Sequence, residues 1–352
     1  MSRFEPDPTP ARVLVKEVNW LGDLVMSLPA LRAVRGAYPH AELSILIKQE
    51  LASFFDGMTW VDRVMPYRIR AGLAGIADRW RVIAAIRAVG FDLAVLFPAS
   101  FEAALWTAAA GVPVRAGFAS DARGWLLTRR AKRRPELESR HQAHDYLAML
   151  GETLDIEGAA ENLGIEADEG NRERMRRWLD AKRRRPGAPL IAVAAAAAYG
   201  PAKEWPAERY GALIDELAER HGAECVLVGA PAERGKCEAI AAGVRSGALV
   251  AAGETTIGEL AALLSLSAGF AGNDSGAMHL AGALGIPTVG VFGSTNPART
   301  GPLGPRTAIL YDRIECSPCL DRTCRFGHYQ CLKRISPDHV IGALARLGAI
   351  AG

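Results

Sequence analysis

The chain has 352 residues, of which 49% are hydrophobic, and it carries a formal net charge of +3. This length suits two domains better than one, and so small a charge gives no indication of nucleic-acid binding. No run approaches the roughly 20 apolar residues that span a bilayer. Residues 1–10 are acidic and rich in proline, without the pattern of a signal peptide. The composition therefore predicts a cytoplasmic globular protein.

The first part of the chain alternates strands with helices. Strands are expected at residues 12–18, 42–48, 61–66, 91–97 and 114–118, and helices at 24–38, 73–89 and 100–110. The expected strand at 91–97 is almost continuously apolar, which is typical of a parallel sheet covered on both faces. This alternation predicts a doubly wound α/β domain.

The loop after the first strand, residues 19–23, lies where ligand crevices form in open α/β sheets. It lacks the Gly-x-Gly-x-x-Gly pattern of dinucleotide-binding folds, which argues against a Rossmann dehydrogenase. Asp23 has two interpretations. Its carboxylate could act in catalysis, or it could only cap the following helix.

Two basic segments follow. Between residues 123 and 140 the cations are Arg123, Arg129, Arg130, Lys132, Arg133, Arg134 and Arg140. This run fits a solvated face, or else a patch for a polyanionic acceptor or an anionic membrane surface. A helix is expected at 141–154 and a crossing to a second domain at 157–170. The second basic run, residues 172–185, fits an exposed amphipathic helix.

The alternation resumes at Leu190, with strands expected at 190–197, 224–228 and 249–252 and helices at 206–221 and 257–266. Lys203 lies in a loop containing glycine and proline after the first of these strands. Such a lysine could contact a phosphate as a point charge, or it could be an ordinary surface residue. Both interpretations stay open.

Residues 270–293 contain two buried strands around a helix of small residues. Asp274 and Ser275 are natural N-caps, and Gly276 allows another group to approach the backbone. The free N–H groups and the positive dipole end of such a helix can bind an anion such as a diphosphate. The alternative is an ordinary capped turn, with His279 simply packed on the helix.

Three motifs, at residues 19–31, 199–206 and 273–279, occur in an order that resembles glycosyltransferase family 9, the heptosyltransferases of lipopolysaccharide core synthesis. The tail at 316–331 narrows this resemblance to the heptosyltransferase II group. The resemblance covers nearly the whole chain. It implies a GT-B architecture, in which two Rossmann-like α/β domains with parallel sheets face each other across a cleft. The implied divisions are an acceptor domain at 1–170, a nucleotide-sugar domain at 171–335, and a terminal helix within 336–352 that packs back on the first domain.

The resemblance also implies roles for individual residues. The Asp23 carboxylate is the expected general base. The residues expected to line the nucleotide-sugar site are Lys203, which approaches the diphosphate, with Glu233, Asp274, Ser275, Gly276 and His279. One segment departs from the family: alanines at 194–198 stand where a Pro-Gly-Ala type of turn is expected. The sequence therefore leaves the backbone geometry ahead of Lys203 open.

The implied reaction is inverting transfer of heptose from ADP-heptose to a lipopolysaccharide core acceptor at the inner membrane surface. No cofactor, metal or nucleic-acid partner is expected, and no Asp-x-Asp metal motif occurs. The oligomeric state stays open. The alternatives are a family 9 transferase that uses another nucleotide sugar and a non-catalytic protein that binds one.

The six cysteines fall into two groups. Cys225 and Cys237 occupy ordinary core or helix positions, whereas the tail cysteines are Cys316, Cys319, Cys324 and Cys331. The first pair of the tail resembles half of a zinc knuckle, but the second pair lacks the short spacing. A cytosolic chain argues against disulfides. Structural zinc is therefore left open.

Overall fold

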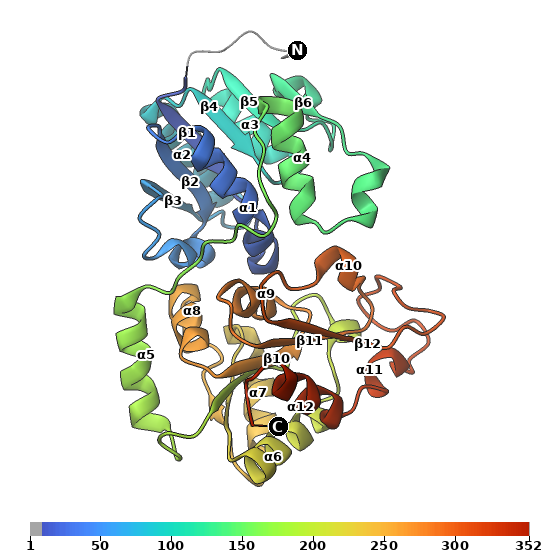
Figure 1. Cartoon of the computed structure of the whole chain (residues 1–352). Helices are drawn as coiled ribbons and strands as arrows, with labels where there is room; N and C mark the ends of the chain where they lie inside the picture. Colours follow the sequence, from blue (N-terminus) through green and yellow to red (C-terminus); the bar gives the residue numbers. More distant parts are fainter. Residues whose placement is uncertain (1–8, 352) are drawn as a thin grey trace. The chain divides into compact units, whose positions relative to one another are not determined.

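The computed structural model describes residues 9–351 and divides into two compact units, with the division between Gly164 and Ile165 (Figure 1). The division falls a few residues before the expected one at 170. As a result α5 (Glu169–Lys182), the exposed helix expected from the second basic run, belongs entirely to the C-terminal unit. Within the described residues, no helix is long and apolar enough to cross a membrane.

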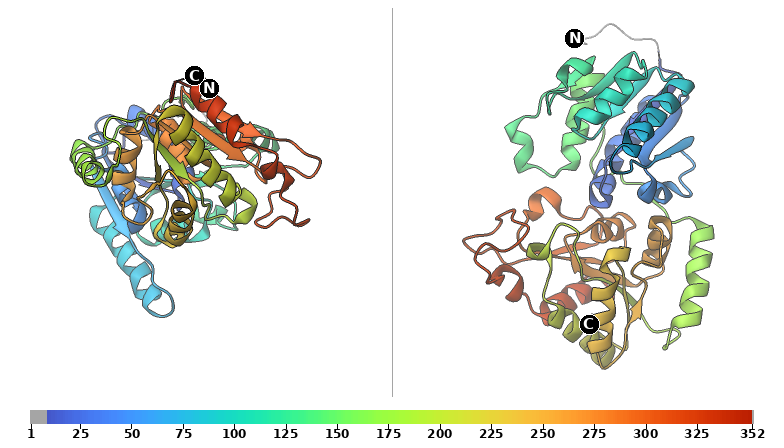
Figure 2. Two further views of the ribbon diagram at one scale, coloured as in Figure 1. Left: turned by 90° about the horizontal axis from the view of Figure 1, so that it is seen from below. Right: turned by 180° about the vertical axis from the view of Figure 1, so that it is seen from behind.

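The N-terminal unit is built on six parallel strands in the order β3-β2-β1-β4-β5-β6. The strands are β1 (Arg12–Lys16), β2 (Glu42–Lys48), β3 (Arg63–Tyr67), β4 (Leu93–Leu96), β5 (Val114–Phe118) and β6 (Arg129–Ala131). The helices are α1 (Leu21–Ala37), α2 (Ala74–Val89), α3 (Phe101–Ala109) and α4 (Ala143–Leu154). α1 packs against α4, and α2 packs against α3, so that each face of the sheet is covered (Figures 1 and 2).

The C-terminal unit repeats this plan with the strand order β12-β11-β10-β7-β8-β9. Its strands are β7 (Leu190–Ala194), β8 (Glu224–Leu227), β9 (Leu249–Val250), β10 (Gly269–Asn273), β11 (Thr288–Phe292) and β12 (Thr307–Tyr311). Besides α5, its helices are α6 (Ala207–His221), α7 (Arg234–Gly243), α8 (Ile257–Ser265), α9 (Gly276–Ala283), α10 (Pro297–Thr300), α11 (Gln330–Lys333) and α12 (Pro337–Arg346). The expected α/β class with two Rossmann-like units is confirmed.

Each sheet has one point at which the strand order reverses. In the N-terminal unit the chain builds outward from β1 to β3, and then returns to place β4 on the other side of β1. In the C-terminal unit the same reversal places β10 beside β7. The loops after the two central strands diverge to opposite faces there, which opens a crevice at their carboxyl ends. Ligand sites are therefore expected after β1 and β4, and after β7 and β10.

The terminal helix α12 packs on α6 and on strands β10, β11 and β12 of the C-terminal unit. Its apolar side is fully enclosed, with Val340 and Leu344 at 0% exposure within that unit's core. This differs from the expectation that the helix packs back on the first domain. The neighbouring sheet already covers the apolar stripe that an amphipathic helix must bury.

Candidate active site

A pocket lies at the carboxyl ends of β1 and β4, at the reversal point of the N-terminal sheet. It is lined by residues 18–20 and Asp23 after β1, by residues 97–99 after β4, and by side chains that include Arg133, Gln142 and Tyr146. Asp23, predicted from its position after the first strand, is thus part of a pocket. The contribution of α4 was not predicted, whereas Arg133 belongs to the basic run for which a polyanionic acceptor was one interpretation.

Asp23 is the third residue of α1 and not its cap. The cap position is held by Trp20, whose side chain makes no capping bond. The Asp23 Oδ1 atom accepts a hydrogen bond of 2.8 Å from Gln142 Nε2 at the start of α4. A carboxylate in the first turn also interacts favourably with the positive end of the helix dipole. The capping interpretation of Asp23 is therefore wrong, and the carboxylate is held by a side-chain donor at the pocket.

Gln142 also links Asp23 to a buried tyrosine. Its Nε2 lies 3.1 Å from the Tyr146 hydroxyl, and the Tyr146 ring packs 5.3 Å from that of Phe97. Burial, with the charge of Asp23 as a further cause, raises the pKa of Tyr146 above its ordinary range. The phenol therefore keeps its proton and can donate a hydrogen bond within the pocket. The spacing of Gln142 and Tyr146, four residues apart on one helix face, was the signal that could have found them.

Two buried ionisable residues lie beneath the Asp23 loop at the end of β1. Glu17 Oε2 accepts a hydrogen bond of 2.9 Å from Ser27 Oγ, and burial raises the pKa of Glu17 to about 7. Burial lowers the pKa of Lys16 to about 7, and its ammonium lies 5.0 Å from the centre of the Tyr67 ring. The Tyr67 hydroxyl donates to Asn19 Oδ1 over 3.1 Å. These contacts tie both ends of the loop to the sheet and to α1.

The cations of residues 123–140 differ in exposure, because Arg123 is buried whereas the others are partly or fully exposed. Arg123 is completely buried and donates hydrogen bonds of 2.9 Å to Phe118 O and 2.6 Å to Pro98 O. Burial lowers the pKa of Arg123 to about 10. Arg133, in contrast, lines the pocket and lies 3.7 Å from the carboxylate of Asp145. One cation of the run is therefore structural, and another lines the pocket that also contains Asp23.

In the C-terminal unit, Lys203 and Asp274 form a buried ion pair, with 2.6 Å between Lys203 Nζ and Asp274 Oδ2. Thr295 Oγ1 donates to the same oxygen over 2.6 Å, and His279 Nε2 lies 3.7 Å from Asp274 Oδ1. Burial opposes ionisation of Asp274, but the neighbouring His279 and the charge of Lys203 outweigh it and lower the pKa of Asp274 to about 2. Asp274 is therefore a fixed anion that orients Lys203 and His279.

The start of α9 lies directly after Asp274. Ser275 is the N-cap, its Oγ accepting from Met278 N, and Gly276 is the first residue of the helix. First-turn N–H groups have no partner within a helix, so they are available to an anion. Asn273 Oδ1 accepts bonds of 2.8 Å from Trp205 N and 2.7 Å from the Tyr210 hydroxyl. This contact binds the end of the Lys203 loop to β10.

The alanine run ahead of Lys203 is shaped by other means than a Pro-Gly-Ala turn. β7 ends at Ala194, and Ala197 N then donates to Glu204 Oε1 over 3.1 Å. Gly200 adopts a φ of 142°, and a Cβ there would lie 2.6 Å from Arg322 O. Ala202 N donates to the same carbonyl over 3.0 Å. Tail and loop are thus in direct contact, and Lys203 still reaches Asp274.

Glu233 does not join this cluster through any contact described for it. It follows β8, on the side of β7 away from β10, and its Oε2 accepts a bond of 2.7 Å from Ala230 N. The carboxylate therefore stabilises its own turn. A role for Glu233 in holding the nucleoside stays a prediction.

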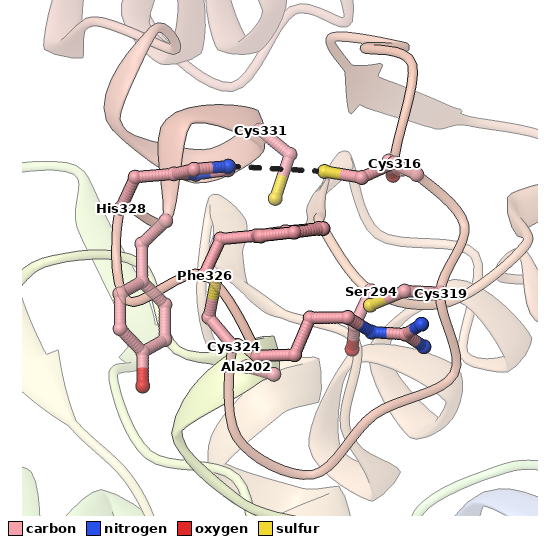
Figure 3. A pocket seen from close by; sticks show the side chains of 11 residues that line it. Ala202, Ser294, Cys316, Cys319, Cys324, Phe326, His328 and Cys331 are labelled. Carbon is pink, nitrogen blue, oxygen red and sulfur yellow. Dashed lines mark hydrogen bonds between the residues drawn. The ribbon is translucent and has the colours of Figure 1, made fainter.

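The tail cysteines surround one small pocket of about 20 Å³ (Figure 3). Cys316 Sγ lies 3.9 Å from His328 Nε2, and the His328 ring stacks on Phe326 at 5.6 Å. The six cysteines are all free thiols. Among residues 9–351, no three His, Cys, Asp or Glu side chains are arranged to hold a metal ion. Structural zinc thus stays a hypothesis without a preformed site, to be tested by metal analysis of the purified protein.

Comparison with known proteins relates this geometry to a family. Residues 79–330 match the family model described as glycosyltransferase family 9 (heptosyltransferase). The chain is 25% identical to lipopolysaccharide heptosyltransferase 2 of Escherichia coli, over 96% of this chain and 98% of that protein. It is 27% identical to the Salmonella typhimurium protein of the same name, over 96% and 98%.

Solved structures agree. The structure of E. coli ADP-heptose lps heptosyltransferase II is similar with a TM-score of 0.81 and 25% identity, over 96% of this chain and 98% of that one. A family 9 glycosyl transferase from Veillonella parvula has the same fold, with a TM-score of 0.82 and 24% identity over 96% and 97%. The family model covers well over half of the sequence. The chain therefore belongs to glycosyltransferase family 9, the heptosyltransferases.

Proposed function

We propose that this enzyme transfers heptose, with inversion, from ADP-L-glycero-D-manno-heptose to the lipopolysaccharide inner core, on an acceptor of the heptosyl-Kdo2-lipid A type. Relatives matched over nearly their whole length are named lipopolysaccharide heptosyltransferases, which supports the substrate class. The observation that carries the proposal is the buried Lys203–Asp274 pair beside the start of α9, at the reversal point of the C-terminal sheet.

The donor diphosphate would bind at that point. The Lys203 ammonium and the N–H groups around Ser275 and Gly276 offer positive charge where negative charge develops as ADP departs. Asp274 does not need to touch the diphosphate. Its fixed negative charge keeps Lys203 and His279 in position, which lowers the cost of organising the site during reaction. In this proposal these residues supply the charge stabilisation, so the transfer needs no metal ion.

Asp23 would act as the general base. The acceptor oxygen attacks the anomeric carbon from the face opposite ADP, a new C–O bond forms, and the bond to the diphosphate oxygen breaks with its electron pair. The acceptor proton passes to the Asp23 carboxylate, and the configuration at the anomeric carbon is inverted. Gln142 holds the carboxylate through its 2.8 Å hydrogen bond, which supports a defined orientation for proton transfer.

The acceptor of this reaction is anionic and anchored in a membrane by its lipid. Arg133 at the pocket supplies a cation of the matching sign. The proposed place of action is therefore the cytoplasmic surface of the inner membrane. No nucleic-acid partner is proposed.

The deciding experiment incubates the protein with a panel of nucleotide sugars, with and without heptosylated Kdo–lipid A, and follows nucleotide release. We expect ADP release only when ADP-heptose and the acceptor are both present, and NMR of the product should show the inverted anomer. Release from another nucleotide sugar alone would replace the donor with that sugar. Tight nucleotide-sugar binding with no transfer to any acceptor would identify a non-catalytic binding protein.

A further inference from the structure

Helix α2 is apolar on the side that faces away from the sheet as well as on the side that packs on it. Val82 and Ile86 belong to the buried side. Leu73, Ile76 and Trp80, spaced by three and four residues on the opposite side, are 85%, 53% and 62% exposed. A surface helix of a globular protein usually carries polar residues on that side. In Figure 2 (left), α2 extends outward from the neighbouring elements of its unit.

Further exposed apolar side chains lie on the neighbouring segments. α2 and α3 are in contact, and an ion pair of 2.5 Å joins Arg79 to Glu102 across them. On α3, Phe101 and Leu105 are exposed, and the Phe101 ring lies 6.3 Å from the exposed ring of Trp125. The outer apolar face is defined here as Leu73, Ile76, Trp80, Phe101, Leu105 and Trp125.

These side chains are concentrated and not scattered. Of the ten large hydrophobic side chains exposed among residues 9–351, six belong to the outer apolar face. Single exposed apolar residues are normal on a protein surface, whereas a contiguous group indicates a binding surface. None of the six lines the pocket that contains Asp23. The face therefore calls for an occupant of its own.

The charges around the face identify that occupant. Residues 68–89 contain five arginines against Asp78, and the α3 side of the face adds Glu102, which pairs with Arg79, and Asp121. The Asp78 side chain is only 8% exposed and already binds Arg70 and Arg81. Aromatic and aliphatic side chains bordered by arginines match the headgroup level of an anionic bilayer, where rings insert and cations bind lipid phosphates. A second copy of the chain would bring the two sets of arginines together, which disfavours self-association through this face.

We propose that the outer apolar face docks the N-terminal unit on an anionic lipid bilayer. Leu73, Ile76, Trp80 and Trp125 enter the headgroup region, and the arginines of residues 68–89 bind the phosphates around them. The face lies on the membrane surface without spanning it. The proposal rests on this surface alone, so it can succeed or fail independently of the transfer reaction.

The test is vesicle co-sedimentation of the full-length protein, with neither donor nor acceptor present. Vesicles of phosphatidylcholine are compared with vesicles that also contain phosphatidylglycerol, at low and high salt. We expect binding to the anionic vesicles, weakened by salt as exposed charges are screened, and a blue shift of tryptophan emission. The double variant Leu73→Glu/Trp80→Glu should bind those vesicles about tenfold more weakly or worse, because it removes apolar contacts and adds two negative charges.

Ile309→Glu is the matched control, since Ile309 is a 42% exposed apolar residue on β12 of the other unit. It should bind like the unaltered protein. Leu73 and Trp80 are exposed, so the double variant should keep its melting temperature, and Trp125→Ser provides a second, milder loss of contact. Equal vesicle binding by the double variant and the unaltered protein would overturn the proposal. So would a dimer in sedimentation velocity that the double variant abolishes while vesicles bind neither form, because that result identifies a second copy as the occupant.

Discussion

Replacing Asp23 with asparagine separates the proposed base from a merely structural carboxylate. Asparagine keeps an Oδ1 atom that can accept the hydrogen bond from Gln142, now 2.8 Å long, and it changes the volume of the pocket little. The principal loss is the negative charge in the first turn of α1. Such a charge contributes about 0.3–1 kcal/mol through the helix dipole. We therefore expect the melting temperature to fall by less than about 4 °C.

The expected effect on catalysis is much larger. A positioned general base typically contributes about 10²–10⁴ in rate, and this corresponds to about 3–5 kcal/mol of activation free energy. The assay measures kcat for acceptor-dependent ADP release, together with the melting temperature and the affinity for ADP from calorimetry. Asp23→Asn should lose kcat by at least about a hundredfold, with nearly unchanged ADP affinity.

Asp145→Asn serves as the matched control, because Asp145 is a second carboxylate of the same pocket. It should reduce kcat far less than Asp23→Asn does. A fully active Asp23→Asn enzyme would refute the base assignment. A loss of ADP affinity and of stability that matches the loss of rate would instead show that the carboxylate only supports the fold.

Three further outcomes are expected. Lys203→Met leaves the buried Asp274 carboxylate without its cation, so urea denaturation should show that the free energy of unfolding falls by about 3–5 kcal/mol. Calorimetry should show a weaker affinity for ADP. Adding Asp274→Asn to this variant should restore stability but not ADP binding. The pKa of Asp274 is lowered from 3.8 to about 2, so its ionised carboxylate stabilises the fold above about pH 4, and this stability is lost as the pH falls through 2. Denaturation curves recorded across that pH range should show the free energy of unfolding fall by about 2 kcal/mol. The Asp274→Asn variant should lack this loss. Gln142→Leu removes the donor to Asp23 and should lower kcat by roughly tenfold, while the donor KM and the melting temperature stay unchanged; an unaltered kcat would argue against a positioning role for Gln142.

The strands and the loops that follow them were predictable because local patterns determine them. Apolar runs of strand length lie at β1, β7 and β10, and the turns after them lead to Asp23 in the first turn of α1, to Lys203 and to Asp274. The strand order was not predictable in this way. It depends on how crossovers pack, and it alone shows that each of these turns lies at a reversal point.

Strands β6 and β12, and the surface on which α12 packs, could not be predicted from local sequence patterns. β6 is only three residues long and contains Arg129 and Arg130, so its sequence indicates part of a charged run and not a strand. It is a strand because it pairs with β5 at the edge of the sheet, where charged residues are common. β12 was also missed. For α12 the apolar stripe was visible in the sequence, but the surface that covers it was not.

Individual residues of the candidate site could be predicted from the sequence, but the contacts between them could not. Lys203 and Asp274 each belong to a separate motif, and their ion pair exists because β7 and β10 are neighbours. Gln142 lies far from Asp23 in sequence, and only the packing of α4 on α1 brings the two side chains together. Side-chain contacts between distant segments are therefore the part that required the structure.

The contact between the cysteine-rich tail and the Lys203 loop affects how chemical inhibition of this enzyme should be interpreted. Burial opposes ionisation of Cys324, but backbone N–H groups of residues 326–329 outweigh it and lower the pKa of the Cys324 thiol. Thiolates react fastest with electrophiles, so we expect iodoacetamide to modify Cys324 before Cys331, whose pKa burial raises to about 11. Alkylation there would disturb the tail that holds Gly200 and Ala202. Inactivation by a thiol reagent would consequently report displaced donor contacts and would not identify a catalytic cysteine.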